Sequence, residues 1–281
     1  MRPRGCPQAQ WGGGMSLVDE AGRSAASDAM TFGDDDWNTS YEVPAEDIWM
    51  LLEDLETLAD WAVIEFHPSG IVGRALDKSH VAMGRSVVPG EKIEAAGAHC
   101  EVGVRVDALN DFQAGFLLSG QDIEVEIDRV DEELTLKEPP LVETLDIRPV
   151  SATRSQRWID VDHGTTARMR GWEFCGAVGG ACGATDLGFV FDADLNDIEL
   201  SSRDTPWETT IEDVVTETAF DSARFSSWFW PDICDRIQVE NDVEIRFGQD
   251  KPIEVQVGDR VEYAVAPQLP NDDEENGGDA R

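Results

Sequence analysis

The strongest constraint on the fold is an order of helix, turn and paired strands that occurs twice along the chain. The segment "DIEVEIDRV", which starts at residue 122, alternates apolar and polar residues, and "EELTL" returns after a short turn. The segments "DVEIRF" and "PIEVQV", which start at residues 242 and 252, repeat this arrangement. Period-two alternation is typical of half-buried strands, and two such strands around a short polar turn predict an antiparallel hairpin.

Matching elements precede each hairpin, which indicates an internal duplication. "PAEDIWMLLEDLETLADW" at 44–61 has its leucines at helical spacing and is followed by strands, and a second helix is expected at 107–118. In the second half, "WEFCGAVGGACGAT" and the aromatic-rich "FSSWFWPDIC" take the places of these helices. The sequence therefore predicts two similar domains, 41–135 and 156–269, each with the same order of strand, helix, strands, helix and hairpin.

The segment between the two domains, 136–155, is predicted to be an extended connector. Pro139, Pro140 and Pro149 disfavour a long helix and any central strand there. Residues 1–40 are expected to be a disordered extension, and 270–281 an acidic disordered tail that follows the apolar stretch "VEYAVAPQL".

The charge balance of the chain is extreme. Asp and Glu total 58 against 22 Lys and Arg, a net charge of −36, yet the chain contains nine tryptophans. In roughly 1 M salt the Debye length falls to about 3 Å, so a dense anionic surface no longer repels itself at long range. This composition predicts a protein of a salt-rich cytoplasm in a halophilic archaeon. We find no apolar run of a length that spans a membrane, and no secretion signal.

Little in the sequence points to catalysis, to a metal or to a cofactor. The histidines and cysteines lack metal-ligand spacing, and "GAVGGACGAT" lacks the lysine of a phosphate-binding loop. The cysteines are expected to be small buried hydrophobes or free thiols. We therefore expect a protein that is not an enzyme.

Four segments, in order, resemble the sliding clamps, the ring-shaped processivity factors of archaeal and eukaryotic DNA replication. They are "LDKSHVAMGRSVV", "VGVRVDALNDFQAGFLLSGQDIEVEI", "ETLDIRPV" at the place of the interdomain connecting loop, and the final "DVEIRFGQDKPIEVQVGDRVEYAVAPQL". The resemblance implies an α+β fold of two clamp domains, with helices on one face of curved antiparallel sheets. It also implies three chains closed head to tail with helices lining the hole. Edge strands near 127–136 and 186–200 are the expected seams.

The resemblance also implies partners. These are encircled double-stranded DNA, a clamp loader, and DNA polymerase and other proteins whose peptide motifs dock in an outer pocket, which implies a nucleoid-associated protein. In this sequence the matching pocket positions are His80, Val81, Leu145, Ile147, Pro252, Ala266 and Pro267. The other interpretation of Val81, Leu145 and Ile147 is ordinary core.

The helices depart from the clamp pattern, because clamp helices carry basic residues toward DNA phosphates. The outward face of the helix at 44–61 instead has Glu46, Glu53, Glu56 and Asp60. Arg105 and Arg236 are the candidate DNA-facing cations, although each is also readily explained as solvated or ion-paired. We therefore expect a divergent haloarchaeal clamp paralogue. The alternatives are a protein-interaction scaffold or regulatory subunit that does not slide on DNA, or a subunit that joins a regular clamp in a mixed ring.

Overall fold

The computed structural model describes residues 39–95, 99–107, 121–153, 158, 161–184, 188–194, 196–202, 205–218 and 221–268. The expected disorder of residues 1–38 and of the tail, and the helix expected at 107–118, lie outside this range except for Asp107. Thr39 and Ser40 already belong to a strand, so the first domain begins two residues earlier than predicted.

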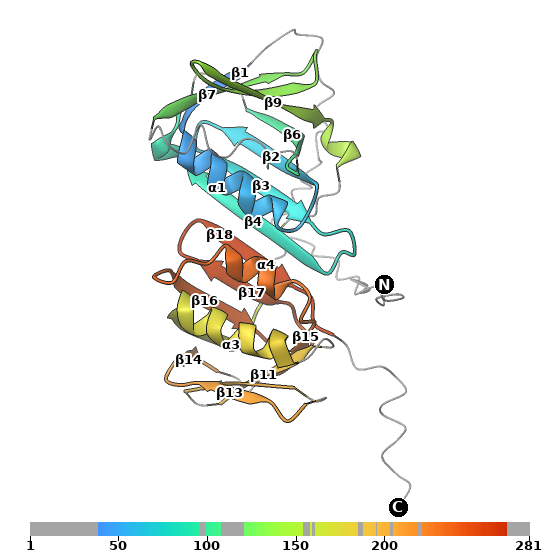
Figure 1. Ribbon diagram of the computed structural model, residues 1–281, viewed down its shortest axis with the longest axis vertical. Helices are drawn as coiled ribbons and strands as arrows, with labels where there is room; N and C mark the ends of the chain where they lie inside the picture. Colours follow the sequence, from blue (N-terminus) through green and yellow to red (C-terminus); the bar gives the residue numbers. More distant parts are fainter. Residues whose placement is uncertain are drawn as a thin grey trace, which may run out of the picture.

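The two halves of the chain have the same architecture (Figure 1). The first half contains β1 (Thr39–Pro44), α1 (Ala45–Glu56), β2 (Trp61–His67), β3 (Gly70–Leu76), β4 (Ala82–Pro89), η1 (Gly90–Lys92), β5 (Glu94–Ala95), β6 (Cys100–Arg105), β7 (Asp122–Asp128), β8 (Glu133–Glu138), β9 (Leu141–Arg148) and η3 (Val150–Ala152). The second half contains β10 (Thr165–Arg170), α3 (Gly171–Ala184), β11 (Phe189–Ala193), β12 (Ile198–Ser201), β13 (Glu208–Ile211), β14 (Val215–Glu217), β15 (Ser222–Phe225), α4 (Trp230–Asp235), β16 (Asp242–Phe247), β17 (Ile253–Val257) and β18 (Val261–Val265).

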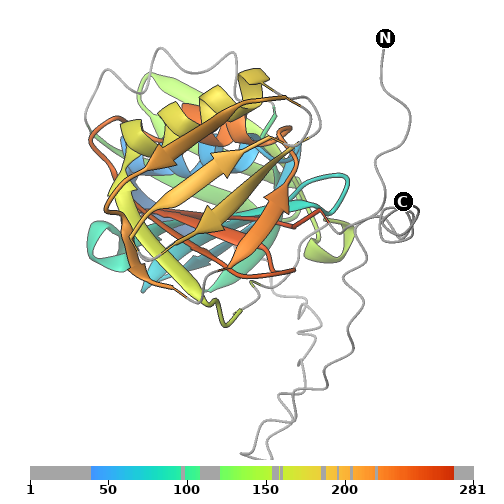
Figure 2. The same ribbon diagram turned by 90° about the horizontal axis from the view of Figure 1, so that it is seen from below.

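The sheet order confirms the duplication. In the first half, β5-β1-β7-β8-β9 and β4-β3-β2-β6 are neighbours, and in the second half β14-β10-β16-β17-β18 and β13-β12-β11-β15 are neighbours. Strand β18 pairs antiparallel with β4 and so joins the two halves into one sheet. The three described helices lie on the same side of the strands in both views (Figures 1 and 2). We call this side the helix face and the opposite side the outer face.

The predicted connector is wrong over its central part. Residues 141–148 form β9, which pairs with β8 over 141–146 and with β6 through Ile147 and Arg148. Pro139 and Pro140 lie in the turn before this strand and Pro149 lies just after it, so no proline interrupts the hydrogen bonding. The segment that joins the two halves is 149–164.

The expected seam strands are also displaced. Residues 127–136 fall in β7 and β8, and 186–200 contain β11 and most of β12; each of these strands has a neighbour on both sides. Among the described residues, open strand edges occur at the sheet ends β5, β13, β14 and β15 and along most of β9.

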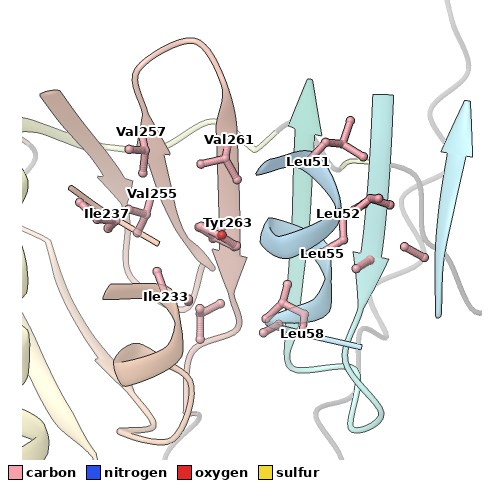
Figure 3. Close-up of a cluster of buried hydrophobic side chains, with 14 of the residues drawn as sticks. Leu51, Leu52, Leu55, Leu58, Ile233, Ile237, Val255, Val257, Val261 and Tyr263 are labelled. Carbon is pink, nitrogen blue, oxygen red and sulfur yellow. The ribbon is translucent and has the colours of Figure 1, made fainter. Parts of the chain in front are cut away.

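Helix α1 packs its leucines on the strands of the first half, as its spacing predicted. Leu51, Leu52 and Leu55 are almost completely buried, and Figure 3 shows them directed at the sheet next to the corresponding contact of the second half. A Cβ added to Gly73 on β3 would lie 2.3 Å from Leu55 Cδ1, so this glycine lets the helix approach the sheet closely.

The second half is built around Trp230, the first residue of α4. Its fully buried ring contacts the rings of four phenylalanines at centroid distances of 5.8 to 6.2 Å, and these are Phe174, Phe189, Phe191 and Phe225. Aromatic side chains bury large areas and prefer such tilted pairs. The cluster attaches both helices to the sheet, although α3 contains several glycines.

Two ion pairs hold α1 against the second half. Arg260, in the turn before β18, donates a 2.8 Å hydrogen bond to the buried carboxylate of Asp54, which also accepts a 2.8 Å bond from the hydroxyl of Ser86. Arg236, at the end of α4, donates a 2.7 Å bond to Glu53. Burial raises the pKa of Asp54 from 3.8 to about 6, and the Arg260 charge offsets only part of this effect.

The raised pKa of Asp54 predicts a pH-dependent stability. Because the pKa is higher in the folded state, the contribution of Asp54 is complete below the unfolded pKa and is lost as pH rises through about 6. We expect the free energy of unfolding of the wild type, relative to Asp54→Asn, to fall by about 2 to 3 kcal/mol between about pH 4 and about pH 7.5. Chemical denaturation of both proteins at several pH values measures this difference. A difference that does not change with pH would contradict it.

Candidate functional site

A loop at the end of β3 is organised by one buried carboxylate. Asp77 Oδ1 accepts hydrogen bonds from the backbone amides of Val81 and Ala82 at 2.6 and 2.7 Å, and Oδ2 accepts one from Ser79 at 2.6 Å. These bonds close a tight turn in which His80 takes a left-handed backbone conformation with φ of 60°. The run "DKSHV" is therefore a rigid turn, and its histidine side chain is exposed.

The C-terminal end of β18 lies against this loop. The amide of Ala266 donates a 2.7 Å hydrogen bond to the carbonyl of Val81. Pro252 precedes β17, whose first residue pairs with Val265, so this proline is next to Ala266 in register. The structure thus brings together His80, Val81, Pro252, Ala266 and Pro267, five of the seven residues predicted for the pocket.

The two remaining residues, Leu145 and Ile147, are elsewhere. They lie on β9 at the other side of the first half, are 1 % and 5 % exposed, and belong to the main hydrophobic core. For these two, the pocket role is wrong and the core interpretation is correct. The error follows from the misplaced connector, because a strand and not a loop carries them.

Beside the Asp77 loop is an apolar patch that the sequence analysis did not identify. Leu76, Met83 and Ala264 come from the adjacent strands β3, β4 and β18, and they form a separate cluster from the main core. Met83 is directly opposite both Leu76 and Ala264 in register, so the three side chains lie on the same face. The main core contains Val261, Tyr263 and Val265 of β18, which alternate with Ala264, so the patch is on the outer face.

The connecting segment contributes Trp158, which packs against this patch. We call Leu76, Met83, Ala264 and Trp158 the outer patch. A cavity of about 380 Å³ adjoins it, with Trp61 and Arg148 in its lining, and the Arg148 guanidinium stacks 3.8 Å from the centre of the Trp61 ring. Small-molecule and peptide sites combine such apolar surfaces with a few fixed polar groups.

Farther along, the connecting segment is attached to the outer face of the second half. His163 Nε2 lies 3.3 Å from Glu254 Oε2, and both side chains are almost fully buried. The ammonium of Lys251 contacts the carbonyl of Asp162. Arg246 lies 3.5 Å from Glu254, so the buried carboxylate has a fixed positive partner.

The helix face offers few cations. Helices α1, α3 and α4 contain neither lysine nor arginine, and the exposed side chains around them include Glu46 and Asp232. Arg236 is on this face, but it is paired with Glu53.

Arg105 is not on the helix face. Its neighbours Val102 and Val104 point into the core below α1, so Arg105, with the opposite parity on β6, points to the outer face. There it hydrogen-bonds Asp107 at 2.8 Å and lies 3.6 Å from Asp146. Its predicted role as a DNA-facing cation is therefore wrong, and the ion-paired interpretation is correct.

The described residues contain no group of three or more His, Cys, Asp or Glu side chains placed to hold a metal ion. No helix in the described part of the chain is long and apolar enough to cross a membrane.

The fold as a whole superposes on solved structures of PCNA. The PCNA of A. fulgidus, solved with the C-terminal region of FEN-1 bound, superposes with a TM-score of 0.73 at 18 % identity, covering 83 % of this chain and all of that chain. The chain has the sliding-clamp fold. The PCNA of Thermococcus kodakaraensis gives a TM-score of 0.68 at 17 % identity, over 83 % of this chain and all of that one. That of Entamoeba histolytica gives 0.70 at 12 % identity, over 83 % and 99 %.

In the comparisons of sequence, no family model and no curated protein matches the chain. The chain thus has the clamp fold at only 12 to 18 % sequence identity to these solved clamps.

The sequence contains a signal for the outer patch. Leu76 and Met83 immediately flank the "DKSHVA" run, and Ala264 alternates along β18 with residues of the core. Because successive side chains of a strand point to opposite faces, this alternation places the three patch residues on the face away from the core. Trp158 has no such periodic signal, because it lies between strands.

Proposed function

We propose that this chain is a docking subunit of a clamp-type ring that serves DNA replication or repair. The observation that supports this most is the outer patch beside the rigid Asp77 loop, where Leu76, Met83 and Ala264 are only 5 to 7 % exposed and Trp158 packs against them. A peptide that presents apolar and aromatic side chains would dock there in place of Trp158. In the A. fulgidus structure, PCNA binds the C-terminal region of FEN-1.

Ring formation is supported by the strand edges. Within the chain, β18 of the second half pairs with β4 of the first half. The strand equivalent to β18 in the first half is β9, and the strand equivalent to β4 in the second half is β13. In the described part of the chain, β9 has an unpaired edge over 141–146, and β13 pairs only with β12. A head-to-tail contact between β9 of one copy and β13 of the next buries both edges, and such contacts close into a ring when the rotation fits.

The charges on these edges favour a mixed ring as the second arrangement. Strand β9 carries Glu143 and Asp146, and β13 carries Glu208 without a basic residue. Like charges that face each other across strands are destabilising. A regular clamp subunit with a basic edge is therefore a better partner for these strands at moderate salt, whereas molar salt permits a ring of identical copies.

The proposal is tested with a synthetic peptide of the FEN-1 C-terminal region, titrated into the full chain in about 2 M KCl by fluorescence anisotropy. Met83→Glu is expected to weaken binding at least about tenfold, because it places a carboxylate in the apolar patch. Val87→Glu is the matched control: it lies on the same strand and the same face, about 13 Å away at the strand rise per residue. Equal losses in both variants, or no binding by the wild type, would overturn the docking role.

Two further measurements on the same sample separate the ring from the DNA role. Light scattering should give a mass of three copies, alone or with a regular clamp, and a lone monomer under both conditions would contradict the ring. Retention on circular primed DNA with a clamp loader then distinguishes a sliding clamp from a scaffold. Peptide binding without retention identifies the scaffold.

A further inference from the structure

Three cysteines gather where α3 meets α4. Cys175 and Cys182 are two turns apart on α3, so they lie on one side of that helix. The Cys175 sulfur is 3.8 Å from the carbonyl oxygen of Cys234 on α4, and the Cys182 sulfur is 3.4 Å from the carbonyl oxygen of Ser227, which precedes α4. All three thiols are half-buried and unoxidised.

The three thiols are not equivalent. The interaction between the two side chains lowers the pKa of Cys175 and raises that of Cys234. Cys175 is thus the sulfur of the pair that carries negative charge more readily. Burial raises the pKa of Cys182 to about 11, so this thiol is a poor nucleophile at neutral pH.

We propose that Cys175 and Cys234 form a redox-active dithiol that closes to a disulfide between α3 and α4 when it meets a small-molecule disulfide. The two residues come from different helices, the Cys175 sulfur lies 3.8 Å from the Cys234 carbonyl oxygen, and both residues are partly exposed. Rotation of the two side chains would bring the sulfurs to a bond of about 2.05 Å.

The reaction proceeds in two balanced exchanges. The Cys175 thiolate attacks one sulfur of the small disulfide, forms a mixed disulfide and releases one small thiolate. Cys234 then loses its proton and attacks the Cys175 sulfur, which expels the second small thiolate. The two protein thiols are oxidised, and one disulfide is reduced to two thiols.

The position of the pair gives the disulfide a structural consequence. Helix α3 contains five glycines and α4 has only six residues, so both depend on their mutual packing. The bond would join residues 59 positions apart in the sequence. Such a closed loop restricts the unfolded chain, and we expect the oxidised protein to melt roughly 5 °C or more above the reduced protein.

The test treats the full chain with bis(2-hydroxyethyl) disulfide at neutral pH in molar salt, and maps the products by non-reducing peptide mass spectrometry. The wild type should lose two hydrogens and give a cross-linked pair of peptides containing Cys175 and Cys234. Cys234→Ser should stop at a mixed disulfide on Cys175, and Cys175→Ser should form no cross-link.

Cys182→Ser is the matched control, since it removes a thiol from the same helix face and should leave the cross-link unchanged. A cross-link between Cys182 and Cys234, or equal mixed-disulfide labelling of all three cysteines, would overturn the assignment. A wild type that gives no cross-link would do the same. Each readout is chemical, so none depends on the docking function.

Discussion

Replacing Trp230 by alanine is expected to lower the free energy of unfolding by about 3 to 5 kcal/mol, a large part of the roughly 5 to 15 kcal/mol that stabilises an ordinary protein. The ring is fully buried and contacts four phenylalanines that come from α3, β11 and β15. Its loss therefore leaves a cavity that both helices and the sheet border. Chemical denaturation in molar salt measures the change.

Trp228→Ala is the control for this variant. Trp228 lies two residues earlier in the chain but is 70 % exposed, and its replacement should change the free energy of unfolding by no more than about 0.5 kcal/mol. If the two variants were equally destabilised, the aromatic cluster would not be the core of the second half. The contrast depends only on burial, because the residue type and the sequence neighbourhood are the same.

Transfer to low salt is expected to have an effect of similar size. The chain carries a net charge of −36, and the sheet aligns acidic residues: Asp128, Glu133 and Asp146 lie directly opposite one another across β7, β8 and β9. Lowering the salt from about 2 M to about 0.1 M lengthens the Debye length to about 10 Å, so these carboxylates repel one another. We expect Tm to fall by at least about 10 °C, which corresponds to roughly 3 kcal/mol or more.

Two comparisons assign this effect to charge. Sucrose, which does not screen charges, should not substitute for the salt at low ionic strength. Glu133→Lys, in the middle of the acidic row, should recover up to about 1 kcal/mol at low salt and much less at high salt. A Tm that does not depend on salt would contradict the inference that the protein is adapted to a salt-rich cytoplasm.

The sequence predicts three elements correctly: the hairpins at 122–138 and 242–257 and the helix α1. In each, the apolar residues recur at the strand or helix period, and these residues form the buried face. Strand β9 does not, although it is as regular as β8. The prolines around it predict that no central strand forms there, and only the register shows that they lie at its two ends.

The candidate site shows the same division. The resemblance to the clamp family predicts that the run "DKSHVA" and Ala266–Pro267 lie together. The hydrogen bond from the Ala266 amide to the Val81 carbonyl shows that these two segments are in contact. Leu145 and Ile147 have the same apolar character as the true patch residues. Their place in the core depends on which face of β9 is covered by the helices, and a single residue of register decides that.

The sequence by itself determined the repeated elements, the acidic surface and the two-domain plan, because each is a local or compositional property of the chain. The tertiary structure alone decided which residues share a surface: the outer patch with Trp158, the outward direction of Arg105, and the meeting of Cys175 with Cys234. These depend on contacts between segments far apart in the chain, and they are set by strand register and by how helices pack across the sheet, for which no local pattern codes.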